Sequence, residues 1–122
     1  MQPHERISQA IAAANDAGRT ALVPFITAGY PDPATFISTL QAVAAEGDVV
    51  ELGVPFSDPM ADGMTIQRSS FSAIEQGVTL SWIFEQLDAA GDAIDTPLVM
   101  MSYLNPLLAY GYERLAKRAR DT

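Results

Sequence analysis

Hydrophobic positions along the chain alternate between a helical spacing and short unbroken runs. Residues 5–18 carry Ile or Ala at every third or fourth position, which is typical of an amphipathic helix, and Gly18 stands where that helix should end. Residues 21–27, ALVPFIT, form a run too short for a helix and predict a strand. Because Pro24 has no amide hydrogen, it should lie at the start, the edge or a bulge of this strand.

The same alternation continues through the middle of the chain. Asp32 followed by Pro33 is typical of a helix start, and the apolar positions after it keep a helical spacing as far as Gly47. Residues 48–54, DVVELGV, are mostly apolar, as in a strand covered on both faces. Further along we expect, in order, a helix over 65–77, a helix capped by Thr79 and closed by Gly91, a strand over 97–103, a turn over 105–111 and a helical segment over 115–119.

A helix followed by three strand-and-helix rounds predicts a single α/β domain, residues 1–122, with a parallel sheet and right-handed crossovers. Two architectures share this order of elements. One is a small doubly wound sheet, and the other is part of an eight-stranded barrel. In both, ligands gather at the carboxyl ends of the strands. The pattern alone does not choose between them.

Composition narrows the class of function. The 122 residues are 48% hydrophobic and carry a formal net charge of −8, which argues against binding to nucleic acid phosphates or to an anionic membrane. No apolar stretch approaches the roughly 20 residues of a membrane span, and the start lacks the pattern of a signal peptide, so we expect a cytoplasmic protein. There are no cysteines and one histidine, His4, so neither a thiolate site nor a histidine-based metal cluster is expected.

Two carboxylates stand in unlike surroundings in the stretch ELGVPFSDPMADG, residues 51–63. Glu51 follows an apolar run, which should disfavour its ionised form, whereas Asp62 lies in a polar loop that should keep it ionised. Such a difference suits a pair with separate acid–base and electrostatic roles. The plainer interpretation is a solvated or ion-paired Glu51 and ordinary turn chemistry at Asp62 before Gly63.

Three motifs closely resemble the alpha subunit of tryptophan synthase, a (β/α)8 TIM barrel. They are VPFITAGYPDP at 23–33, ELGVPFSDPMADGMTIQ at 51–67 and MSYLNP at 101–106. The resemblance implies a partial barrel, with an N-terminal helix plus about three βα units, truncated after the third. It also implies the family's reaction in tryptophan biosynthesis, a retro-aldol cleavage of indole-3-glycerol phosphate to indole and glyceraldehyde 3-phosphate.

The resemblance assigns roles to individual residues. Glu51 matches the acid–base position, and Asp62 the carboxylate that accepts a hydrogen bond from the indole N–H. Phe25 and Tyr103 match positions that line the indole pocket, and Met101 is expected beside them. For Phe25 and Met101, core packing is an equally good interpretation. Thr65 is expected to position the aspartate loop, or else to cap the helix that follows.

Partners follow from the same resemblance. Pro55, Asp58 and Pro59 lie in the loop through which family members contact the beta subunit, although two prolines also make a turn rigid without any partner. The alpha subunit needs neither cofactor nor metal. Pyridoxal phosphate is expected only in the beta subunit.

Three features differ from the family pattern. Gly47 is followed directly by Asp48, where the family has one more residue, and the shorter connection could shift the strand that carries Glu51. Met64 replaces a frequent proline, which should leave the catalytic loop less restrained. The sequence also ends before the glycine-rich loops that bind phosphate in the family.

From the missing phosphate loops we expect impaired or absent catalysis by the chain alone, and from the last strand's open edge possible self-association. The alternative function is a non-catalytic fragment that binds a beta subunit or a complementary half-barrel.

Overall fold

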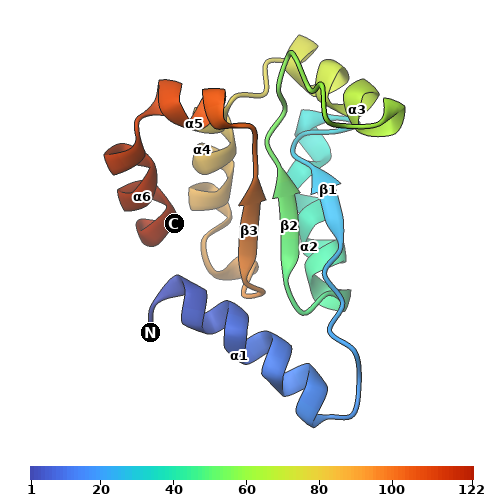
Figure 1. Cartoon of the computed structure of the whole chain (residues 1–122), viewed down its shortest axis with the longest axis vertical. Coiled ribbons are helices and arrows are strands. Elements are labelled where there is room, and N and C mark those ends of the chain that lie inside the picture. The colour runs from blue at the N-terminus through green and yellow to red at the C-terminus, as the bar shows by residue number, and fades with distance from the viewer.

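A computed structural model describes all residues, 1–122, and shows one three-stranded parallel sheet. The strands are β1 (Phe25–Thr27), β2 (Val50–Gly53) and β3 (Leu98–Met101), side by side in chain order (Figure 1). In register, Phe25 pairs with Glu51 and Glu51 with Val99. The order shows no reversal, as a segment of a barrel requires.

Helices flank the sheet on one face and at both ends of the strands (Figure 1). Helix α1 crosses below the amino ends, and α3 and α5 lie near the carboxyl ends. Their bounds are α1 Pro3–Asp16, α2 Phe36–Glu46, α3 Met64–Glu75, α4 Leu80–Ala90, α5 Leu104–Tyr110 and α6 Tyr112–Asp121, with short 3₁₀ turns at Pro33–Thr35 and Gly91–Ala93. No helix is both long and apolar enough to cross a membrane.

The hydrophobic core lies between the sheet and helices α2 and α4. Val50 and Leu52, alternate residues of β2, are fully buried. They belong to one cluster with side chains of both helices, namely Phe36, Leu40, Ile83 and Phe84. Because successive strand residues point to opposite faces, the residues between them must lie on the other side of the sheet.

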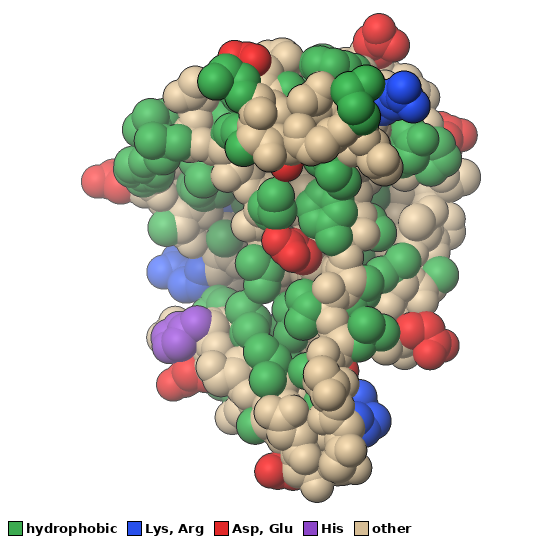
Figure 2. All heavy atoms as spheres, turned by 45° about the vertical axis from the view of Figure 1, so that its right-hand side comes forward, with side chains coloured by type: hydrophobic (Ala, Val, Ile, Leu, Met, Phe, Trp, Pro, Cys, Tyr) green, Lys and Arg blue, Asp and Glu red, His purple; other side chains and the backbone are tan.

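That second face, here called the open face, carries the alternate set of strand residues. It consists of Phe25 and Thr27 from β1, Glu51 and Gly53 from β2, and Val99 and Met101 from β3. Figure 2 shows hydrophobic side chains gathered around an acidic one on one side of the molecule. Met101 is 40% exposed, so this face is only partly covered.

The three predicted strands are confirmed, but each is shorter than its hydrophobic run. Residues 21–24 precede β1 because Pro24 cannot donate to a ladder, although its carbonyl accepts from the Glu51 N–H at 2.8 Å. Leu22 and Val23 are correspondingly exposed.

Two predicted helix starts are confirmed. The Asp32 carboxylate accepts the Ala34 N–H at 3.0 Å and begins the 3₁₀ turn that leads into α2, and Thr79 Oγ1 accepts the Trp82 N–H at 3.1 Å. Both are N-caps in which a side-chain oxygen satisfies a free backbone donor.

Two local predictions are wrong. Residues 105–111 are not a turn, because Leu104–Tyr110 forms α5. Pro106 is tolerated there since the first turn of a helix has no acceptor for its N–H groups. Thr65 does not cap α3, because the N-cap position belongs to Gly63. Met64 is the first residue of α3 and is largely exposed.

Candidate functional site

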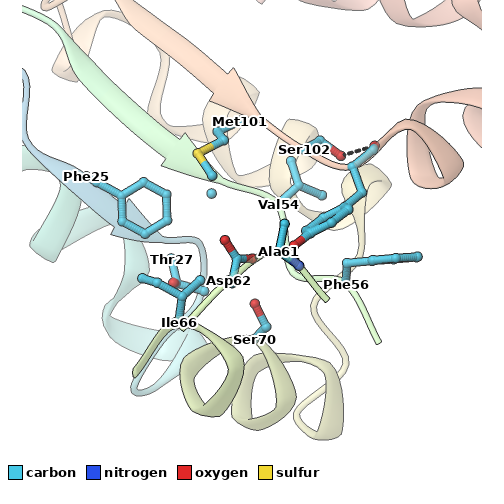
Figure 3. A pocket seen from close by; sticks show the side chains of 12 residues that line it. Phe25, Thr27, Val54, Phe56, Ala61, Asp62, Ile66, Ser70, Met101 and Ser102 are labelled. Carbon is cyan, nitrogen blue, oxygen red and sulfur yellow. Dashed lines mark hydrogen bonds between the residues drawn. The ribbon is translucent and has the colours of Figure 1, made fainter. Parts of the chain in front are cut away.

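A cavity of about 230 Å³ opens above the carboxyl ends of the strands. Figure 3 shows Asp62 inside it, between Phe25 and Ala61, with Met101 on the strand side. The lining comes from the open face (Phe25, Thr27, Gly53, Met101), from the loop after β2 (Val54, Phe56, Ala61, Asp62), from α3 (Ile66, Ser70) and from the segment after β3 (Ser102, Tyr103). Three of the predicted pocket residues, Phe25, Met101 and Tyr103, therefore lie around Asp62.

The Asp62 carboxylate is held in place from across the cavity. Tyr103 Oη donates to Asp62 Oδ2 at 3.1 Å and accepts the Ala61 N–H at 2.9 Å. Tyr103 thereby joins the end of β3 to the loop after β2. Since Tyr103 contacts only Oδ2, Oδ1 is left to accept another donor.

The loop that carries Asp62 is also braced from below. The Asp62 N–H donates to the Pro59 carbonyl at 3.1 Å, and Gln67 Nε2 donates to the Asp62 carbonyl at 2.9 Å. The Phe56 ring stacks on the Tyr103 ring with centroids 5.2 Å apart. These contacts restrain the loop that leads into α3 at Met64.

Gly53 shapes the floor of the cavity. A Cβ atom at this position would lie 2.5 Å from Cζ of Phe25, so only glycine lets the aromatic ring rest over β2. The Phe25 ring therefore lies over Gly53, two residues beyond Glu51.

A buried hydroxyl pair ties α3 to β1. Thr27 Oγ1 and Ser69 Oγ lie 2.7 Å apart, and Ser69 Oγ donates to the Ile66 carbonyl at 2.9 Å. With its donor used on Ile66, Ser69 accepts the Thr27 hydroxyl hydrogen. The link fixes the helix that follows the Asp62 loop.

Glu51 lies on the open face but does not line the cavity. It sits in the row of Phe25 and Val99, two residues before Gly53, which is roughly 7 Å down the strand. Its side chain is half-buried. The structure thus puts the two carboxylates on the same side of the sheet at different depths.

The other predicted site residues lie outside the cavity. Thr65 is exposed in the first turn of α3. Of the proposed partner-binding residues, Pro55 and Pro59 are buried and only Asp58 is exposed. Met60, in the same loop, is 80% exposed, so Asp58 and Met60 are both accessible at the surface of this loop.

Several lining residues were not singled out from the sequence. Phe56 is part of the quoted motif, but nothing in its position showed that it would stack on Tyr103. Ile66 and Ser70 are four residues apart, which marks one face of a helix, and that spacing could have identified them.

A second hollow, of about 310 Å³, lies on the core side of β3 between α4 and α6 and is mainly apolar. No group of three or more His, Cys, Asp or Glu side chains comes close enough together to hold a metal ion.

Comparisons with known proteins identify the family. The family model for the tryptophan synthase alpha chain matches residues 11–122. The alpha chain of Desulfovibrio desulfuricans is 49% identical over 114 residues, which cover 93% of this chain and 45% of that protein. The alpha chain of Laribacter hongkongensis is 50% identical over 117 residues, or 94% of this chain and 44% of that protein.

Solved structures agree with these relatives. The alpha subunit of Legionella pneumophila has a TM-score of 0.84 at 35% identity and is matched over 99% of this chain and 46% of its own. Tryptophan synthase from M. tuberculosis gives 0.85 at 32% identity, over 93% of this chain and 46% of that one. The chain spans about half the length of the proteins it matches, and its sheet is a partial TIM barrel. It belongs to the tryptophan synthase alpha chain family.

Proposed function

We propose that this chain carries the acid–base pair of an alpha-type retro-aldol cleavage, in which indole-3-glycerol phosphate gives indole and glyceraldehyde 3-phosphate. One observation carries the proposal: Asp62 is fixed at an aromatic-lined cavity on the same side of the sheet as Glu51. A carbon–carbon lyase of this kind needs no redox or metal chemistry, and we expect pyridoxal phosphate only in a beta subunit.

The reaction needs two proton movements. Indole C3 must gain a proton as its bond to the glycerol carbon breaks, and the hydroxyl on that carbon must lose one as the aldehyde forms. Glu51 is the group proposed to give and take these protons. Its half-buried place on the open face supports this role.

Asp62 is proposed to stabilise the charged ring. Protonation at C3 places positive charge on the indole nitrogen, and a carboxylate that accepts the N–H hydrogen bond offsets that charge. The free Oδ1 of Asp62, held beside Phe25 and Met101, supports this geometry. Thr65 is exposed, so its proposed role in positioning the loop has no contact to support it.

The test is indole release from indole-3-glycerol phosphate by the purified chain, with and without a beta subunit. Glu51→Gln and Asp62→Asn should abolish the release, whereas Glu75→Gln, at an exposed carboxylate on α3, should leave it unchanged. We expect release to be slow, because the chain spans about half the length of the relatives that it matches. Equal release by the wild type and Glu51→Gln would contradict the proposal.

A second function, partner binding without catalysis, is favoured by the free strand edges. The β3 residues 97, 99 and 101 bond to β2, so the N–H and C=O groups of Leu98 and Met100 point away from the sheet. A complementary half-barrel or a second copy could pair there. The exposed Asp58 and Met60 are the proposed contact with a beta subunit.

These two functions make different predictions. Binding of a beta subunit that is kept in Glu51→Gln, with no indole release in either form, would favour the partner-binding function. Self-association through the edges should appear as a concentration-dependent mass in sedimentation. A monomer at every concentration would rule that contact out.

A further inference from the structure

Asp48 makes an unusually dense set of contacts just before β2. Its carboxylate accepts hydrogen bonds from both terminal nitrogens of Arg19. Nη2 donates to Oδ1 at 2.9 Å, and Nη1 donates to Oδ2 at 3.2 Å. Oδ2 also accepts the Leu22 N–H at 2.8 Å, and the Asp48 N–H donates to the Leu22 carbonyl at 2.9 Å. Both backbone groups of Leu22 are thus bound to one residue.

These contacts lie at the amino end of the β1–β2 ladder, where the Val49 N–H also donates to the Leu22 carbonyl at 3.5 Å. Leu22 and Asp48 are separated by the same number of residues as Phe25 and Glu51, so they keep the register of the strands. β1 itself has only three residues. The Asp48 contacts therefore add a substantial share of the bonds that hold β1 to β2.

The connection before β2 has no slack. A Cβ atom on Gly47 would lie 2.8 Å from Cδ of Pro24, so the end of α2 rests directly on the ring that precedes β1. Asp48 follows at once. A one-residue slip of β2 against β1 would turn Glu51 to the core face, so the contacts beside this connection bear on where Glu51 lies.

The environment of the ion pair is consistent with a lasting contact. The Asp48 side chain is 14% exposed, although Arg19 is 55% exposed. The hydrogen bond from Arg19 and that from the Leu22 amide lower the pKa of Asp48. Such a bidentate pair gives geometric specificity as well as energy.

We propose that Asp48 and Arg19 are positioning residues that lock the register of β2 against β1 and so hold Glu51 on the open face. The role of Glu51 rests on the proposed function, but the register itself can be measured without it. Neither residue touches the cavity.

The experiment is amide hydrogen exchange of the 122-residue chain, followed by NMR at two neighbouring residues of β2. The Glu51 N–H bonds to Pro24 on the β1 side, and the Val50 N–H bonds to Pro97 on the β3 side. In Arg19→Gln, exchange at Glu51 should become about tenfold faster while exchange at Val50 changes by less than about twofold. Asp48→Asn, which keeps an acceptor for Leu22, should show the same asymmetry.

Arg6→Gln is the matched control. Arg6 also joins the α1 region to a segment that precedes a strand, because its Nη2 donates a hydrogen bond to the Asp95 carbonyl at 2.7 Å. That segment, however, precedes β3 and not β1. Exchange at Glu51 should not change in this variant. Equal acceleration at Glu51 and Val50 in Arg19→Gln, or none at Glu51, would overturn the proposal.

Steady-state kinetics of indole release separate this proposal from the proposed function. Where the wild type releases indole, Arg19→Gln should lower kcat with little change in KM, because Glu51 moves and the cavity does not. If the wild type releases no indole, only the proposed lyase function is ruled out. The hydrogen-exchange result still tests the proposal on strand register.

Discussion

The two faces of the same sheet differ in what they must accomplish. The core face places Val50 and Leu52 against α2 and α4 and contains only apolar groups from the strands. The open face places Glu51, Thr27 and Gly53 beside aromatic and apolar side chains. Alternate residues of one strand thus serve packing on one face and the proposed chemistry on the other. Variants on the two faces should therefore change different properties.

The largest effect on stability is expected on the core face. Leu52→Ala would remove a fully buried side chain and should lower the free energy of unfolding by about 3 kcal/mol in urea titrations. Glu51→Gln, one residue earlier, should change it by less than about 0.5 kcal/mol, because the side chain is half-buried and keeps its shape. Similar losses for both variants would contradict the division of the faces.

Gly53 offers a test at the floor of the cavity. Gly53→Ala would push the Phe25 ring toward the cavity and should lower the free energy of unfolding by roughly 1–2 kcal/mol. Indole affinity should fall as well, as calorimetry can measure. Gly63→Ser is the control, since nothing lies within 4 Å of a Cβ there and serine is a good N-cap. A harmless Gly53→Ala would show that Phe25 does not depend on this close approach.

Tyr103 should have a smaller effect on stability. Tyr103→Phe keeps the stacking on Phe56 but removes the hydroxyl that binds Asp62 and Ala61, at an expected cost of about 1 kcal/mol. Tyr112→Phe, at an exposed ring on α6, should be neutral. Identical melting curves for the two variants would mean that the Asp62 loop is held by its other contacts.

The smallest effect concerns pH and the amino end of the sheet. Arg19 lowers the pKa of Asp48 below its ordinary value of 3.8, so the charged form is favoured by folding. The resulting stabilisation is present at neutral pH and is lost as the pH falls through the lowered pKa. The stability difference between wild type and Asp48→Asn should therefore be constant from pH 7 to about 5 and shrink below 3.8. A stability difference that stays the same at all pH values would contradict a stabilising ion pair.

The core face was predictable from sequence and the open face only in part. Hydrophobic runs locate all three strands, and the caps at Asp32 and Thr79 locate two helix starts, because these signals are local. The bond between Tyr103 and Asp62 joins residues 41 apart in the chain and has no local signal. The same holds for Arg19 and Asp48. The family motifs brought Phe25, Met101 and Tyr103 together because they carry information on position that periodicity lacks.

The depth of Glu51 shows the limit of the motif. The sequence places Glu51 within the strand over 48–54, but the cavity is lined from Gly53, two residues further along β2. The strand register and the position of the Phe25 ring set the depth of Glu51 below the cavity, and both depend on contacts between segments that are distant in the sequence. The helix α5 was missed because a proline suggested a turn, although a proline in the first helical turn costs little.

The most direct test of the account is an NMR titration of the chain with indole. Shifts should concentrate on the open face and its cavity, at Phe25, Asp62 and Tyr103, and should vanish in Asp62→Asn. The core residues Leu87 and Leu107, which line the second hollow, should not move. Shifts centred on that hollow, or unchanged binding in Asp62→Asn, would contradict the claim that the open face is the functional one.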